Sequence, residues 1–229
     1  MDKNKIKIIL IKFVIFVVAL LFVRQLYQRS FCESRNEKMT FNSYFFREEQ
    51  RQLMYEGYFY PLSYRDIWQE VNLNIYEIKR FDDAILYTLE LEQLEVSDPM
   101  DEIRMGRRFF GYFYVTADEI YYRPLGDMNG YSDEKSQKVV QEIQENEREF
   151  LEKCVVVCCE NGTENVADEG GWHQYVEVDG ERRIFHLYND YTSGTREYGQ
   201  MVWEKGKGLI YYRHGTGGMQ MHIELWMLD

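Results

Sequence analysis

The sequence has few prolines, few cysteines and a shortage of cations, and each shortage excludes a class of protein. Three prolines in 229 residues, with no stretch rich in proline and glycine, provide no linker between domains, so we predict a single domain. Lysine and arginine number 27 against 39 acidic residues. Because proteins that bind nucleic acid neutralise its phosphates with clustered cations, DNA and RNA are not expected partners.

The four cysteines do not have the spacing of a metal site or of a disulfide scaffold. Cys154, Cys158 and Cys159 lie in a valine-rich segment, far along the chain from Cys32. A zinc ribbon requires two C-x-x-C pairs, and a domain of this length does not need disulfides for its core. We interpret the three clustered cysteines as small apolar core residues, with a disulfide to one of them as the alternative.

Sequence signatures of catalysis and of nucleotide binding are missing as well. Ser193 lacks the G-x-S-x-G context of a nucleophile elbow, and acidic residues are too numerous for a catalytic pair to be singled out. The segment Trp203–Gly208, WEKGKG, has the glycines and lysines of a phosphate-binding loop but leads into a strand-like segment, so a hairpin turn is predicted; the same holds for HGTGG at 214–218. The sequence therefore predicts no catalytic residue, no metal ligand and no cofactor.

Two histidines are the one pair that a metal ion could share. The Asp-Gly dipeptide at 179–180 is a strong hairpin signal, and a two-residue turn there places His173 opposite His186 and Glu177 opposite Arg182. Two imidazoles so placed have Cβ atoms about 5 Å apart, but a stable site needs a third ligand. We interpret the histidines as partly exposed neighbours of a cross-strand ion pair and not as metal ligands.

An apolar segment near the N-terminus is the first positive feature of the sequence. A helix over Ile6–Tyr27 would be about 33 Å long, enough to span a bilayer, and the bulky, charged residues that follow it lack a signal-peptidase site. We therefore predict a single-pass membrane anchor over 1–27, a polar stalk over 28–42 and an extracytoplasmic domain over 43–229. Lipid attachment at Cys32 is an alternative means of anchoring.

The domain that follows the predicted anchor is strongly acidic. Residues 1–32 contain six cations and one acid, so residues 33–229 keep 21 cations and 38 acids, a net charge of −17. Anionic lipid headgroups repel such a domain, and we expect contact with the bilayer through the N-terminal helix alone. Cations flank the apolar segment almost equally on both sides, so a cytoplasmic domain is the alternative to an exported one.

Hydrophobic periodicity predicts an α+β fold, an antiparallel β-meander sheet with one or two covering helices. Apolar and polar residues alternate over 85–92, as in a strand with one wet face, while the aromatic segment Phe109–Val115 begins a hairpin and residues 172–228 repeat the hairpin pattern. One helix is predicted to begin at Ser132 and a second near Ser63-x-x-Asp66. The apolar face of the first helix would carry Val139, Ile143, Phe150 and Leu151.

The final strand, Met219–Leu228, is predicted to close the core. Alternation places Ile223 near the middle of its buried face and Glu224 on the opposite, solvated face. The buried face would consist of Met219, Met221, Ile223, Leu225 and Met227. An aspartate at Ile223 would then be far more damaging than the loss of the Glu224 carboxylate.

One part of the sequence resembles a known group of proteins. The ending Val202–Gly218, VWEKGKGLIYYRHGTGG, continued by Ile223–Leu225, resembles the C-terminal end of small membrane-anchored proteins of Gram-positive bacteria that have no assigned activity. The resemblance covers the last quarter of the chain. It implies an anchored, exported domain and supplies no site residue.

The aromatic strands and the missing site signatures favour a non-enzymatic binding or interaction module, with an envelope protein or a glycan as its partner. The alternative is a cell-envelope hydrolase that uses carboxylates on the open face of the sheet. The two hypotheses predict different surfaces. A cleft with two facing carboxyls of raised pKa favours hydrolysis, whereas a sheet face with exposed tyrosine and tryptophan favours binding.

Overall fold

The computed structural model describes residues 41–60, 67–93, 109–124, 132–190, 197–216 and 221–228. They belong to one compact unit, Phe41–Asp229. The predicted anchor over 1–27, Cys32 and most of the predicted stalk lie outside the described residues. Within the described ranges, no helix is long and apolar enough to cross a membrane.

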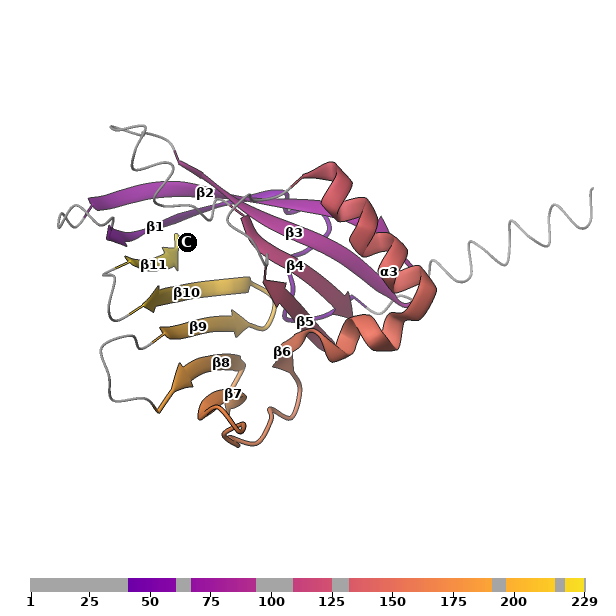
Figure 1. Ribbon diagram of the computed structural model, residues 1–229. Helices are drawn as coiled ribbons and strands as arrows, with labels where there is room; N and C mark the ends of the chain where they lie inside the picture. The colour runs from indigo at the N-terminus through magenta and orange to yellow at the C-terminus, as the bar shows by residue number, and fades with distance from the viewer. Residues whose placement is uncertain are drawn as a thin grey trace, which may run out of the picture. The chain divides into compact units, whose positions relative to one another are not determined.

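The described strands form one antiparallel sheet in the order β6-β5-β4-β3-β2-β1-β11-β10-β9-β8-β7 (Figure 1). The strands are β1 Gln52–Tyr60, β2 Ile67–Arg80, β3 Ala84–Gln93, β4 Phe109–Thr116, β5 Glu119–Pro124, β6 Val155–Cys159, β7 Trp172–Asp179, β8 Arg182–Asn189, β9 Glu197–Glu204, β10 Gly208–Thr216 and β11 Met221–Met227. Strands β1 to β6 are paired in sequence order, and so are β7 to β11, while β6 and β7 lie at the two edges of the sheet. The pairing of β11 with β1 joins the two halves. The predicted α+β class and antiparallel meander are confirmed.

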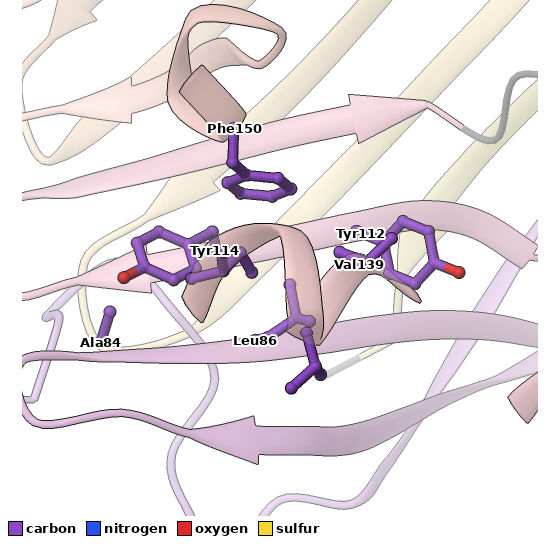
Figure 2. Packing of buried hydrophobic residues seen from close by; sticks show 8 residues of the cluster. Ala84, Leu86, Tyr112, Tyr114, Val139 and Phe150 are labelled. Atoms are coloured by element: carbon purple, nitrogen blue, oxygen red, sulfur yellow. The ribbon is translucent and has the colours of Figure 1, made fainter. Parts of the chain in front are cut away.

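Helix α3, Asp133–Glu152, covers one face of β3, β4 and β5. Its N-cap is Ser132, whose Oγ accepts a hydrogen bond from the Lys135 amide at 3.2 Å, and two acids occupy the first turn, where the helix dipole favours them. Figure 2 shows Val139 and Phe150 of the helix close to Leu86, Tyr112 and Tyr114 of the sheet. The helix predicted at Ser132 is confirmed. The buried cluster comprises Ala84, Leu86, Tyr112, Tyr114, Val139, Val140, Ile143 and Phe150.

The second predicted helix is wrong. Its proposed start, 63–66, lies outside the described residues, and the residues that would form its body belong to β2. Buried Val71, Leu73 and Ile75 alternate there with polar residues, which is the period of a strand. Pairing with β1 on one side and β3 on the other satisfies the backbone of the segment, so tertiary context overrides the local helix-start signal.

Strand β3 is confirmed, but its polar side is not wet. Thr88 and Glu90 are buried. The Thr88 hydroxyl donates to the Gly111 carbonyl oxygen at 2.8 Å, and the Tyr76 hydroxyl donates to the Glu90 carboxylate at 2.8 Å. Hydrogen bonds therefore replace the water that alternation alone had predicted on this face.

The other face of the sheet encloses an aromatic core because the sheet curls on itself. Phe110 of β4 packs on Tyr212 of β10 with 4.3 Å between ring centroids, although four strands separate β4 from β10 in the sheet order. Trp203 of β9 is fully buried, and its ring centroid lies 5.8 Å from that of Phe45 and 6.0 Å from that of Phe113. The two halves of the sheet thus share one core.

The segment 41–51, which precedes β1, ties this core to two turns. The Asn42 side-chain amide donates to the Thr116 carbonyl oxygen at 3.0 Å, beside the β4–β5 turn. The Gly206 amide, in the β9–β10 turn, donates to the Ser43 carbonyl oxygen at 2.7 Å. Asn42 is buried, so the end of the predicted stalk packs as part of the domain.

The buried Arg183 of β8 connects the end of β6 to the β7–β8 turn. Its guanidinium donates to four backbone carbonyl oxygens and lies over the Tyr44 ring, with Cζ 4.8 Å from the centroid. The four acceptors are Gly180 at 3.0 Å, Arg182 at 2.8 Å, Cys159 at 3.0 Å and Glu160 at 2.9 Å. The outer edge of β7 is also bonded, because the Thr163 amide donates to the Val176 carbonyl oxygen at 2.9 Å. Hydrogen bonds from Arg183 and from the segment that follows β6 therefore hold the two edges of the curled sheet together.

Strand β11 lies between β1 and β10 and carries its deepest residue at Leu225, not at Ile223. Ile223 is half-buried, and Met219 lies outside the described residues. Glu224 does lie on the opposite face, as predicted. That face is not simply solvated, because Glu224 accepts a hydrogen bond from the Tyr211 hydroxyl at 2.6 Å.

Candidate functional site

Helix α3 covers one face of the sheet on β3 to β5. The same face continues over the next seven strands, β2, β1, β11, β10, β9, β8 and β7. Strand pairing places one residue from each of these seven strands in a single row on that face. The row is Trp68, Tyr58, Glu224, Arg213, Gln200, His186 and Tyr175. All seven side chains are exposed or half-buried, whereas the opposite face is the aromatic core. We call this surface, from β2 to β7, the open face.

Four rings meet at the β2 end of the open face and form what we call the tryptophan cluster: Tyr58, Trp68, Tyr211 and Trp226. Tyr58 stands edge-on to Trp68, with 4.6 Å between centroids, and Trp226 stacks on Trp68 at 6.0 Å. Tyr211 lies 5.6 Å from Trp226. Trp68 is 48% exposed, so the cluster presents a large apolar ring to solvent. Burial, together with the hydrogen bond to Glu224, raises the pKa of Tyr211 and keeps its hydroxyl a donor.

A second group of rings, which we call the histidine–tyrosine ladder, lies on β7 and β8. His173 stacks on Tyr188 at 4.5 Å and His186 stacks on Tyr175 at 4.7 Å. Each imidazole has a carboxylate partner: His173 Nε2 lies 2.9 Å from Asp190, and His186 Nε2 lies 3.0 Å from Glu177. Stacking and hydrogen bonding together hold all four rings in fixed positions.

The predicted facing of His173 and His186 is wrong. The turn residues are Gly180 and Glu181, so Asp179 pairs with Arg182 and His173 pairs with Tyr188. Gly180 has a φ of +56°, the conformation that the first central position of such a turn requires. The imidazoles are therefore diagonal neighbours. Among the described residues, no group of three His, Cys, Asp or Glu side chains could hold a metal ion.

Charge on the open face is predominantly acidic. The outward positions of its strands carry Glu56, Glu70, Glu177, Asp179, Glu204 and Glu224 against Arg182 and Arg213. Arg182 is already bound to Glu204, with 2.8 Å between Nε and the carboxylate. Arg213 lies over the Tyr198 ring, its Cζ 4.7 Å from the centroid.

The carboxyls give no support to an acid catalyst. Within the part of the chain that the structure describes, each carboxyl with a shifted pKa is shifted downward. A hydrogen bond from Lys207 lowers the pKa of Glu204. Burial opposes the shift at Glu142, but hydrogen bonds from Lys153 and a neighbouring arginine lower its pKa, and the exposed Glu134 is lowered by its lysine partner. A general acid for hydrolysis needs the opposite shift.

The clustered cysteines and the WEKGKG segment have structural roles. Cys158 and Cys159 are buried and Cys154 is half-buried, and all three are free thiols, which agrees with their interpretation as core residues. Burial raises the pKa of Cys154 to about 12, so its thiol is a poor nucleophile. The WEKGKG segment forms the predicted β9–β10 hairpin, and Gly208, with φ +96°, leaves the space in which the Phe46 ring packs.

No family model, curated protein or solved structure matches this chain. The resemblance of its ending to membrane-anchored proteins stays a prediction. The candidate site therefore rests on geometry alone. The sequence predicted an open sheet face but not the residues that form it, because its row joins strands that span residues 58 to 226 and only the pairing registers place those residues side by side.

Proposed function

We propose that this protein is a binding module whose ligand docks on the open face of the sheet. The observation that supports this proposal is the exposed tryptophan cluster. It lies on the same sheet face as the histidine–tyrosine ladder, and a continuous row of paired residues across seven strands connects the two. Tryptophan, tyrosine and arginine are the residues that dominate the energy of protein interfaces. Rigid rings on paired strands also lose little conformational entropy on binding, which favours recognition by a preformed surface.

The exposed Trp68 gives a direct test of this proposal. The full-length chain in a nonionic detergent would be titrated with neutral oligosaccharides and with basic and acidic peptides, by calorimetry. We expect Trp68→Ala to weaken the binding of a recognised probe by about tenfold, the effect of an exposed anchor worth about 1.4 kcal/mol. Val166→Ala, a change at an exposed apolar residue outside the face, should leave that affinity within about twofold.

Two results would contradict the binding module. One is that Trp68→Ala changes the affinity for none of the probes, although the variant melts at the same temperature as the parent chain. The other is steady turnover of a glycan or peptide that survives Trp68→Ala and is abolished by Glu224→Gln, which would favour the envelope hydrolase. The lowered pKa of Glu204 on the open face argues against the second result, because a general acid needs a raised pKa.

We further propose that residues 1–27 anchor the domain to a membrane, with the domain outside the cytoplasm. The support is the apolar segment Ile6–Tyr27 and the missing cleavage site after it. The expressed chain should sediment with membranes at full mass and resist extraction by high salt, because a spanning helix is not held by charge. A soluble species shortened by about 30 residues would show that the segment is a cleaved signal peptide.

A further inference from the structure

Two glutamates on the open face lie directly opposite each other beside the tryptophan cluster. Glu56 of β1 pairs with Glu70 of β2, and Glu56 also pairs with Trp226 of β11. Directly opposed residues on an antiparallel pair have Cβ atoms about 5 Å apart, and like charges at that separation destabilise a sheet. Among the described residues, neither carboxylate has an ion-pair partner. A cation placed at this position would relieve the repulsion.

The neighbouring rings are suited to the same cation. Trp68 and Tyr58 pair in the row next to Glu56 and Glu70, so the tryptophan cluster borders the carboxylates. Lysine and arginine are attracted to the faces of tryptophan and tyrosine rings. The open face already contains one such contact, since the Arg213 guanidinium lies 4.7 Å from the Tyr198 centroid.

Resting on the proposed function, we infer that the ligand of the open face is a basic peptide segment, with a lysine or arginine side chain bound between Glu56, Glu70 and the tryptophan cluster. The charge of the domain agrees with this choice, because residues 33–229 carry −17 and attract a cationic partner over long range. A neutral saccharide could donate hydroxyl hydrogen bonds to the two carboxylates but has no positive charge to relieve the repulsion between them. Anionic polymers would be repelled by them.

The test compares three probes on the full-length chain in nonionic detergent: a blocked dodecapeptide of alternating arginine and glycine, its glutamate counterpart, and cellohexaose. We expect calorimetric binding of the arginine peptide alone. The double variant Glu56→Gln, Glu70→Gln should weaken that binding by at least about tenfold. The matched pair Glu134→Gln, Glu149→Gln removes two exposed carboxylates from α3 and should change the affinity by less than about twofold. Melting curves confirm that each variant is folded.

The outcomes separate this inference from the proposed function. Equal weakening by both double variants would show a general attraction to an acidic protein, and would overturn the site at Glu56 and Glu70. Binding of cellohexaose that depends on Trp68, with no binding of the arginine peptide, would overturn the basic ligand but keep the binding module. Probes that bind without any dependence on Trp68 would overturn both.

Discussion

The variant Arg183→Ala is expected to have a free energy of unfolding about 3–5 kcal/mol below that of the parent chain, because four backbone carbonyl oxygens lose a charged donor and each buried acceptor left unsatisfied costs about 1–3 kcal/mol. The guanidinium donates to four backbone carbonyl oxygens, in the β7–β8 turn and at the end of β6. Its loss leaves acceptors without donors and releases the contact between the end of β6 and the β7–β8 turn. Thermal unfolding followed by near-ultraviolet circular dichroism measures the change.

Arg182→Ala is the matched control, one residue away. The Arg182 side chain is half-exposed and pairs with Glu204, and surface ion pairs of this kind contribute about 1 kcal/mol or less. Arg183→Lys should resemble Arg183→Ala more than the parent, because an ammonium has three donors and cannot bond all four acceptors. Equal melting temperatures for Arg182→Ala and Arg183→Ala would refute the role given to Arg183.

Trp203→Ala should lower the free energy of unfolding by about 3–5 kcal/mol, the usual cost of emptying an aromatic site in a core. Trp203 lies in the centre of the curled sheet, where rings from the N-terminal segment, β4 and β9 meet. Its neighbours are Phe45 at 5.8 Å, Phe46 at 6.0 Å and Phe113 at 6.0 Å. Urea unfolding, with a two-state fit, gives the free-energy difference.

Two further tryptophan variants test whether the loss of stability in Trp203→Ala comes from the burial of its ring. Trp203→Phe should cost only about 1–2 kcal/mol, since the buried indole Nε1 has no hydrogen-bond partner among the described residues and only volume is lost. Trp68→Ala removes a ring that is 48% exposed and should cost about 1 kcal/mol or less. If Trp203→Ala were no more damaging than Trp68→Ala, the two halves of the sheet would not share a core.

Local sequence signals were sufficient for most elements of the fold. Ser132 with two following acids marks the start of α3, and alternation marks β3 and the hairpins, because caps and side-chain periods depend on residues only a few positions apart. The helix start at 63–66 misled for the same reason. A four-residue pattern carries no information about β1 and β3, the strands that flank β2 and supply its hydrogen bonds.

The β7–β8 register shows where local reasoning ends. Moving the turn by one residue changes the partner of His173 from His186 to Tyr188 but leaves every side chain on the same face. The hydrophobic pattern is therefore identical in both registers. In the register observed, Gly180 occupies the first turn position with a positive φ, and Arg183 donates to its carbonyl oxygen.

By itself, the sequence determined the α+β class, the antiparallel hairpins, the capped helix and the acidity of the domain, since each of these follows from composition or from neighbours along the chain. Only the tertiary structure decided the curl of the sheet and the open face. Both depend on the pairing of β1 with β11, which brings Tyr58 beside Glu224 and Glu56 beside Trp226. Contacts between residues so far apart in sequence leave no periodic trace, because any strand edge can satisfy the same backbone hydrogen bonds.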